Sequence, residues 1–77
     1  MNEKEKLLKS IAEIQNQIIN YNRKDAINLI IKVRKEHLGK EQIAYVTNNI
    51  PLERGTDNDI INTLKAEETR LILKLQD

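Results

Sequence analysis

The N-terminal part of the chain carries apolar side chains at alternating intervals of three and four. The residues in this series are Leu7, Ile11, Ile14, Ile18 and Tyr21. Such spacing places them on one face of a helix. We expect Leu8, Ala12 and Ile19 to widen this face to the breadth that a bundle helix buries. Asn2 followed by Glu5 is typical of a helix start, so the sequence predicts a helix over residues 3–21.

A second apolar segment follows a short polar one. Asn22 and Asp25 have the spacing of an N-cap and the third helical residue, which predicts a break or sharp kink and then a helix over residues 23–38. One continuous helix is the competing interpretation. The apolar residues of the second segment are Ala26, Ile27, Leu29, Ile30, Ile31 and Val33. Their density indicates a central helix that other elements cover on several sides, ending before Gly39.

Two further helices are expected in the second half of the chain. A short one over residues 40–49 ends before the proline at position 51, and residues 51–55 form the one expected loop. Thr56 and Asp59 have the spacing of a capping pattern, which opens a last helix over residues 57–76. Its apolar residues are Ile60, Ile61, Leu64, Leu71, Ile72 and Leu75. The predicted fold class is therefore all-α, a small three- or four-helix bundle in one domain of residues 1–77.

Length and composition exclude some kinds of site and indicate a cellular compartment. The chain has 77 residues and no cysteine, so disulfides and thiolate sites are excluded. Its first residues alternate in charge, and no run approaches about 18 apolar residues, so we expect a cytoplasmic protein with no membrane partner. Frequent isoleucine, lysine and asparagine indicate AT-rich codons and a bacterial or phage origin. Homodimerisation stays open, because a chain this short is only marginally stable alone.

Charge is balanced overall but uneven along the chain. The net charge is +1, which does not favour a nucleic-acid binder on bulk charge. Residues 23–40, however, hold six basic and two acidic side chains. The strongest basic cluster consists of Lys32, Arg34, Lys35 and Lys40. We interpret it as solvated charge at a helix end, and phosphate contacts are the alternative interpretation.

No group of residues has the spacing of a catalytic, cofactor or metal site. His37, the only histidine, has no cysteine or second histidine to act with, so we interpret it as a surface residue that complements a helix dipole. The acidic pairs Asp57/Asp59 and Glu67/Glu68 lack the partners of a phosphate or calcium site. We therefore expect a protein that is not an enzyme and holds no cofactor.

Glu68 interrupts an apolar series on the last helix. The other members of that series are Ile61, Leu64, Leu71 and Leu75. The carboxylate either lies at the edge with its stem packed, or meets a basic side chain of the second helix, or faces a partner; the first interpretation is preferred.

The expected function is a protein-binding module, an inhibitor or regulator of the immunity, antitoxin or phage-antagonist type that occludes a partner surface. The expected contact residues are Tyr45, Leu52, Arg54 and Glu68, since tyrosine and arginine are frequent interface anchors and Leu52 has no evident place to be buried. The alternative is a small nucleic-acid-binding transcriptional regulator that uses the basic end of the second helix.

Overall fold

The protein is a bundle of helices, as the sequence predicted. The computed structural model describes residues 2–37 and 50–77. These ranges form the α-helices α1 (Glu3–Ile19), α2 (Arg23–His37) and α3 (Asp57–Gln76), with a short 3-10 helix, η2 (Leu52–Arg54), before α3. The predicted all-α class is thereby confirmed. The expected helix over residues 40–49 lies outside the described residues.

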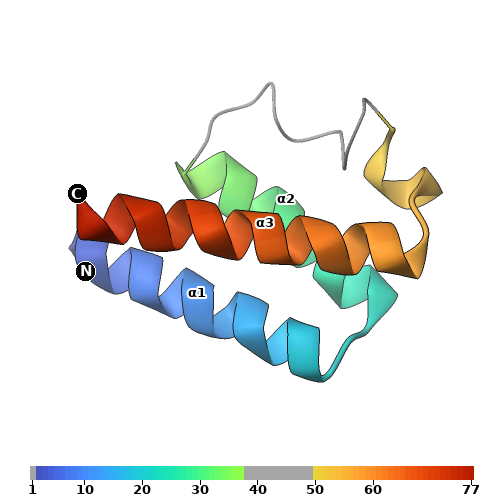
Figure 1. Ribbon diagram of the computed structural model, residues 1–77, viewed down its shortest axis with the longest axis horizontal. Helices are drawn as coiled ribbons and strands as arrows, with labels where there is room; N and C mark the ends of the chain where they lie inside the picture. The colour runs from blue at the N-terminus through green and yellow to red at the C-terminus, as the bar shows by residue number, and fades with distance from the viewer. Residues whose placement is uncertain (1, 38–49) are drawn as a thin grey trace.

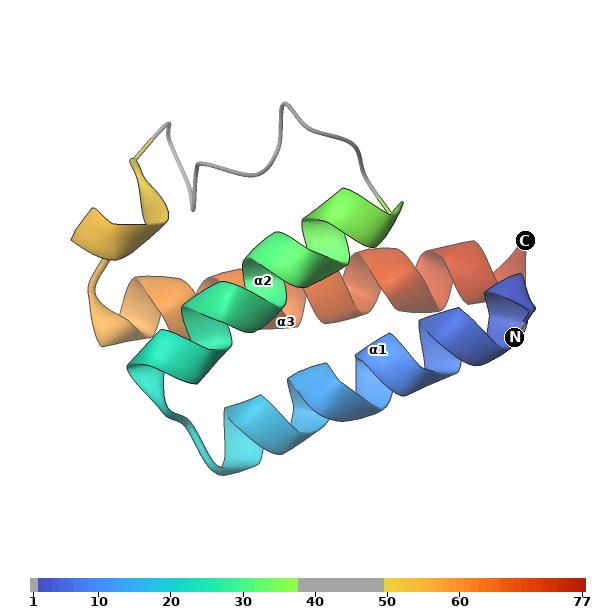
Figure 2. The same cartoon turned by 180° about the vertical axis from the view of Figure 1, so that it is seen from behind.

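The three α-helices pack in two layers. α1 and α3 lie side by side and run in opposite directions, so that the start of α1 and the end of α3 share one end of the bundle (Figure 1). α2 lies across one face of this pair, the face turned away from the viewer in Figure 1 and toward the viewer in Figure 2. The molecule measures 34 × 27 × 18 Å. Because α2 covers only one face of the α1 and α3 pair, the other broad face has no helix over it within the described residues.

α1 and α2 are separate helices. α1 ends where the Asn20 N–H donates to the carbonyl of Asn16 at 2.8 Å. The Asn22 side chain then accepts a hydrogen bond from the Asp25 N–H at 3.1 Å, and the Asn22 carbonyl accepts one from the Ala26 N–H at 2.8 Å. The predicted break is confirmed, and the continuous-helix interpretation is wrong, because this side chain satisfies a free amide at the start of α2.

The other two predicted helix starts are also present. At α1, the Asn2 side chain accepts from the Glu5 N–H at 2.8 Å. At α3, the Thr56 hydroxyl accepts from the Asp59 N–H at 3.1 Å, while the Asp59 carboxylate accepts from the Thr56 N–H at 2.9 Å. The second arrangement is a complete capping box, so the start of α3 is specified by four consecutive residues.

The core lies between α2 and the inner sides of α1 and α3. Its buried apolar residues are Leu7, Ile11, Ile14, Ala26, Ile30, Val33, Leu52, Ile60, Leu64 and Leu71. The expected widening of the α1 face is wrong: Leu8, Ala12 and Ile19 are exposed, whereas Ser10 is buried. The reason is the position of α2, which covers the side of α1 that bears Ser10 and leaves the opposite side uncovered.

The segment before α3 contains a short 3-10 helix, whereas the sequence predicted a loop over residues 51–55. It forms η2, in which the Arg54 N–H donates to the carbonyl of Pro51 at 2.9 Å. Leu52 is fully buried in the core. The prediction that Leu52 lies exposed in a loop is therefore wrong, because the turn of η2 directs this side chain between the helices.

Arg23, the first residue of α2, holds this segment from outside. Its guanidinium donates to the carbonyls of Glu53 at 3.1 Å and Gly55 at 2.6 Å, and to the Asp57 carboxylate at 3.0 Å. The Tyr21 hydroxyl donates to the same carboxylate at 2.7 Å. The beginnings of α2 and α3 are thus tied together.

Among the described helices, none combines the length and apolar character that a membrane crossing requires.

Candidate functional site

A buried ion pair occupies the interface between α2 and α3. Arg34 Nε lies 2.9 Å from Glu67 Oε1, and the two side chains are 4% and 0% exposed. Arg70 also donates to Glu67 Oε1 at 2.9 Å, from a more exposed position. Buried charges are tolerated when they are paired and hydrogen-bonded. Arg34 is therefore a core residue, contrary to its expected place in a surface cluster.

The buried glutamate of α3 is Glu67, not Glu68. Helical positions three and four apart share a face, and the buried positions of α3 are Ile60, Thr63, Leu64, Glu67 and Leu71. The apolar series that includes Glu68 shares Leu64 and Leu71 with this face, but Glu68 itself lies beside the face and is half-buried. Sequence reasoning missed Glu67 because a carboxylate at a core position is recognisable only once its arginine partner is known.

The expected basic cluster is dispersed in the structure. Lys32 Nζ lies 3.4 Å from a carboxylate oxygen of Glu13 on α1, and Lys35 is exposed. Arg34 points inward to Glu67, and Lys40 lies outside the described residues. Phosphate contacts by this cluster stay a prediction, and the burial of Arg34 removes its central member from the surface.

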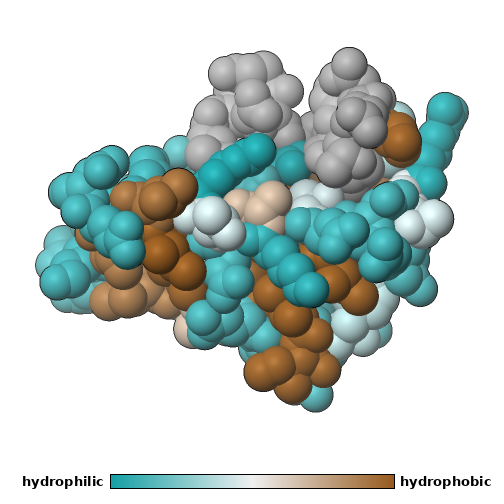
Figure 3. Space-filling model, viewed as in Figure 1, coloured by the Kyte–Doolittle hydropathy of each residue, from teal (hydrophilic) through white to brown (hydrophobic). Residues whose placement is uncertain are grey.

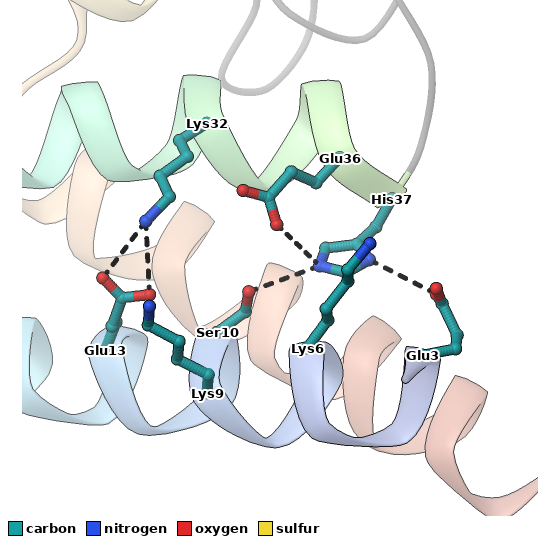
Figure 4. A pocket seen from close by; sticks show the side chains of 8 residues that line it. All are labelled: Glu3, Lys6, Lys9, Ser10, Glu13, Lys32, Glu36 and His37. Atoms are coloured by element: carbon teal, nitrogen blue, oxygen red, sulfur yellow. Dashed lines mark hydrogen bonds and ion pairs between the residues drawn. The ribbon is translucent and has the colours of Figure 1, made fainter. Parts of the chain in front are cut away.

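His37 lines a polar pocket between α1 and α2 (Figure 4). The pocket has a volume of ≈ 620 Å³, and its lining residues are Glu3, Lys6, Lys9, Ser10, Glu13, Lys32, Glu36 and His37. The His37 side chain is 1% exposed, so the interpretation as a surface histidine is wrong. Ser10 is small enough to let the imidazole pack against α1, and its hydroxyl is hydrogen-bonded to His37 Nε2 at 3.3 Å.

The charges around this pocket balance one another. His37 Nε2 lies 3.6 Å from Glu36, and Nδ1 lies 3.8 Å from Glu3. Three lysines and three glutamates line the pocket, so their formal charges cancel. No cluster of three metal-binding side chains occurs in residues 2–37 and 50–77. We therefore interpret these residues as a polar contact between the beginning of α1 and the end of α2.

A second depression lies on the face that α2 does not cover. This α1/α3 groove has a volume of ≈ 440 Å³ and is lined by Gln15, Ile18 and Ile19 of α1 and by Lys65 and Glu68 of α3. Ile19 is 79% exposed. Glu68 is half-buried, which agrees with its expected place at the edge of the apolar series. The groove combines an apolar floor with one charge of each sign.

Further apolar side chains are exposed at the end of the bundle that holds the start of α1 and the end of α3. Leu8 of α1 is 47% exposed and Leu73 of α3 is 58% exposed. The space-filling view shows apolar surface on this face in two areas, one over the C-terminal half of α1 and one near the end where the termini lie (Figure 3). Leu8, Ile19 and Leu73 are thus large apolar side chains that the bundle leaves exposed.

The expected contact residues are not brought together. Leu52 is buried, and Tyr45 lies outside the described residues. Arg54 is exposed in η2, next to the start of α3. Glu68 lies eleven residues after Asp57 on that helix, a distance of about 16 Å along its axis. Of these four residues, only Glu68 lines the α1/α3 groove. Sequence reasoning missed the apolar residues Ile19 and Leu8 as surface residues, because the spacing pattern assigned them to the core.

The chain matches no protein-family model, no curated protein and no solved structure.

Proposed function

We propose that this protein is a non-enzymatic protein-binding module, of the inhibitor or regulator type, that receives a helical segment of a partner protein in the α1/α3 groove. The observation that carries the proposal is the exposure of Ile19, which is 79% accessible at the groove. Leu8 and Leu73 add a second exposed apolar area on the same pair of helices.

The energetic argument starts from the apolar surface. Burial of apolar area stabilises a complex by about 25 cal/mol per Å², and contiguous exposed apolar patches on small proteins commonly mark interaction sites. Lys65 and Glu68 at the groove add charges that can select a partner through complementary charges of its own. A surface of this kind suits a protein partner better than a phosphate backbone, since Glu68 repels phosphate.

The shape of the surface favours a helix as the bound element. α1 and α3 run antiparallel with a shallow depression between them. An additional helix placed in such a depression packs as the next member of a bundle, with side chains inserted between those of the two helices below. An amphipathic helix would present its apolar face to Ile19 through residues spaced by three and four. The cytoplasmic location expected from the sequence is part of this proposal.

The test compares partner capture by two charge-adding variants. Ile19→Glu places a carboxylate at the groove, and Asn28→Glu places one at an exposed position of α2, away from it. We expect the wild-type chain and Asn28→Glu to retain the same protein from host lysate after nuclease treatment, and Ile19→Glu to lose it while keeping the same helical circular dichroism. Equal capture by both variants would remove the groove from consideration, and loss of capture on nuclease treatment would favour the nucleic-acid alternative.

A further inference from the structure

We infer that a second copy of this chain covers the α1/α3 groove, related to the first by a two-fold axis that sets each helix antiparallel against its own copy. The inference rests on the proposed function, because it names the protein whose helices cover the α1/α3 groove. It is carried by a symmetry in the residues on one face of each helix, which are all exposed on α1 and, apart from the exposed Lys65, half-buried on α3.

The first half of this symmetry lies on α3. Positions 61, 65, 68 and 72 follow one another at intervals of four, three and four, so they share one helix face. They are occupied by Ile61, Lys65, Glu68 and Ile72. Read from either end, the order is isoleucine, charge, charge, isoleucine, and the two charges are opposite. An antiparallel copy of α3 therefore places Lys65 of each chain against Glu68 of the other.

The second half of the symmetry lies on α1. Positions 8, 12, 15 and 19 have the same intervals and are occupied by Leu8, Ala12, Gln15 and Ile19, all of them exposed. An antiparallel copy of α1 places Leu8 against Ile19 and Ala12 against Gln15. The two large apolar residues thus meet each other, and the small residue faces the long one, which is the complementarity that close helix packing requires.

One axis can serve both helices. α1 and α3 lie side by side and antiparallel (Figure 1). The centre of the α3 series, between Lys65 and Glu68, lies at the same groove as Gln15, which is next to the centre of the α1 series. A two-fold axis across the groove therefore passes near both centres, and each helix then meets its own copy. This is the self-complementary contact that two-fold dimers use.

The charges favour a second copy over an unrelated chain. In the part of the chain that the structure describes, the Lys65 ammonium and the Glu68 carboxylate have no ion-pair partner. A second copy supplies both missing partners at once. The net charge of +1 adds almost no repulsion between the two copies.

The experiment measures association by light scattering and analytical ultracentrifugation of purified chains. We expect the wild-type protein to show twice the chain mass of 9.0 kDa. Lys65→Glu and Glu68→Lys each make the groove charges alike, so each variant alone should dimerise at least about tenfold more weakly. An equimolar mixture of the two should form a heterodimer, because each variant then offers the charges that the other lacks, and the double variant Lys65→Glu/Glu68→Lys should dimerise like the wild type.

Lys24→Glu, at an exposed position of α2 outside the groove, is the matched control and should leave the dimer unchanged. Circular dichroism confirms that each variant is folded. A wild-type chain that remains monomeric at about 1 mM, the range of very weak association, overturns the inference; so does a mixture that associates no better than the single variants. If Ile19→Glu still loses a captured protein while the wild type is monomeric, the groove binds another protein, and the proposed function stands without this dimer.

Discussion

Removal of Arg34 tests whether the buried ion pair holds α2 against α3. In Arg34→Met an unbranched apolar side chain of similar length takes the place of the guanidinium, which leaves the fully buried Glu67 with Arg70. Breaking a buried pair by removing one partner costs about 3 to 5 kcal/mol. Because Arg70 still donates to Glu67 Oε1 at 2.9 Å, we expect the lower end, about 3 kcal/mol.

This loss is large for a chain of 77 residues. A small core rarely supplies more than about 3 to 5 kcal/mol, so Arg34→Met should be close to unfolding in water. Urea unfolding followed by far-UV circular dichroism measures the effect. With a slope of about 1 kcal/mol per molar urea, the midpoint should fall by about 3 M, or the folded baseline should vanish.

Arg70→Met is the matched control. Arg70 donates to the same carboxylate oxygen, but its side chain is 47% exposed. Glu67 keeps its buried partner Arg34 in this variant, and the half-exposed Arg70 is partly solvated, so Arg70→Met should lose less, about 1 kcal/mol. If the two variants lose equal stability, burial of Arg34 is not what makes its contact with Glu67 important, and the reasoning is refuted.

Three further predictions concern other parts of the bundle. Leu52→Ala should lower the free energy of unfolding by about 2 to 5 kcal/mol in urea unfolding, because it leaves a cavity in the core; a change below 1 kcal/mol would contradict the burial of Leu52. Ile19→Ser should change stability by less than about 0.5 kcal/mol, because the side chain is exposed in the monomer, as thermal unfolding of a dilute sample can check. The hydrogen bonds from Tyr21, and then from Arg23, lower the pKa of Asp57, so its carboxylate adds stability above the unfolded-state pKa, and this contribution is lost as the pH falls through the lower folded-state value. Urea unfolding across the acid range should therefore show a smaller loss in Asp57→Asn than in the wild type, and equal losses would remove this role.

Helix positions could be predicted from the sequence because their signals are local. The predicted range 3–21 compares with Glu3–Ile19, and the range 57–76 coincides with Asp57–Gln76. Asn2, Asn22 and Thr56 each cap the helix that they were expected to open. Such contacts span three residues, so tertiary structure does not alter them.

The rotation of each helix about its axis could not be predicted in the same way. Leu8 and Ile19 fit an apolar face as well as any core residue does, but α2 packs on the other side of α1 and covers Ser10 instead. Likewise, Glu67 and Arg34 are buried because each neutralises the other across two helices. The interaction of such a pair depends on a distance between segments about thirty residues apart, and no local pattern encodes it.

α2 is attached at both ends to residues from the second half of the chain, and this affects how the protein reaches its native state. Arg23 binds the carbonyls of residues 53 and 55, and Lys74 Nζ donates to the carbonyl of His37 at 3.1 Å. These ties join residues 30 to 37 positions apart, so a long stretch of chain must be closed before either forms. α2 therefore gains these two attachments only when α3 arrives, whereas its ion pair with Glu13 of α1 does not depend on α3. We therefore expect folding in a single cooperative step, with a fragment of residues 1–37 remaining unstructured by itself.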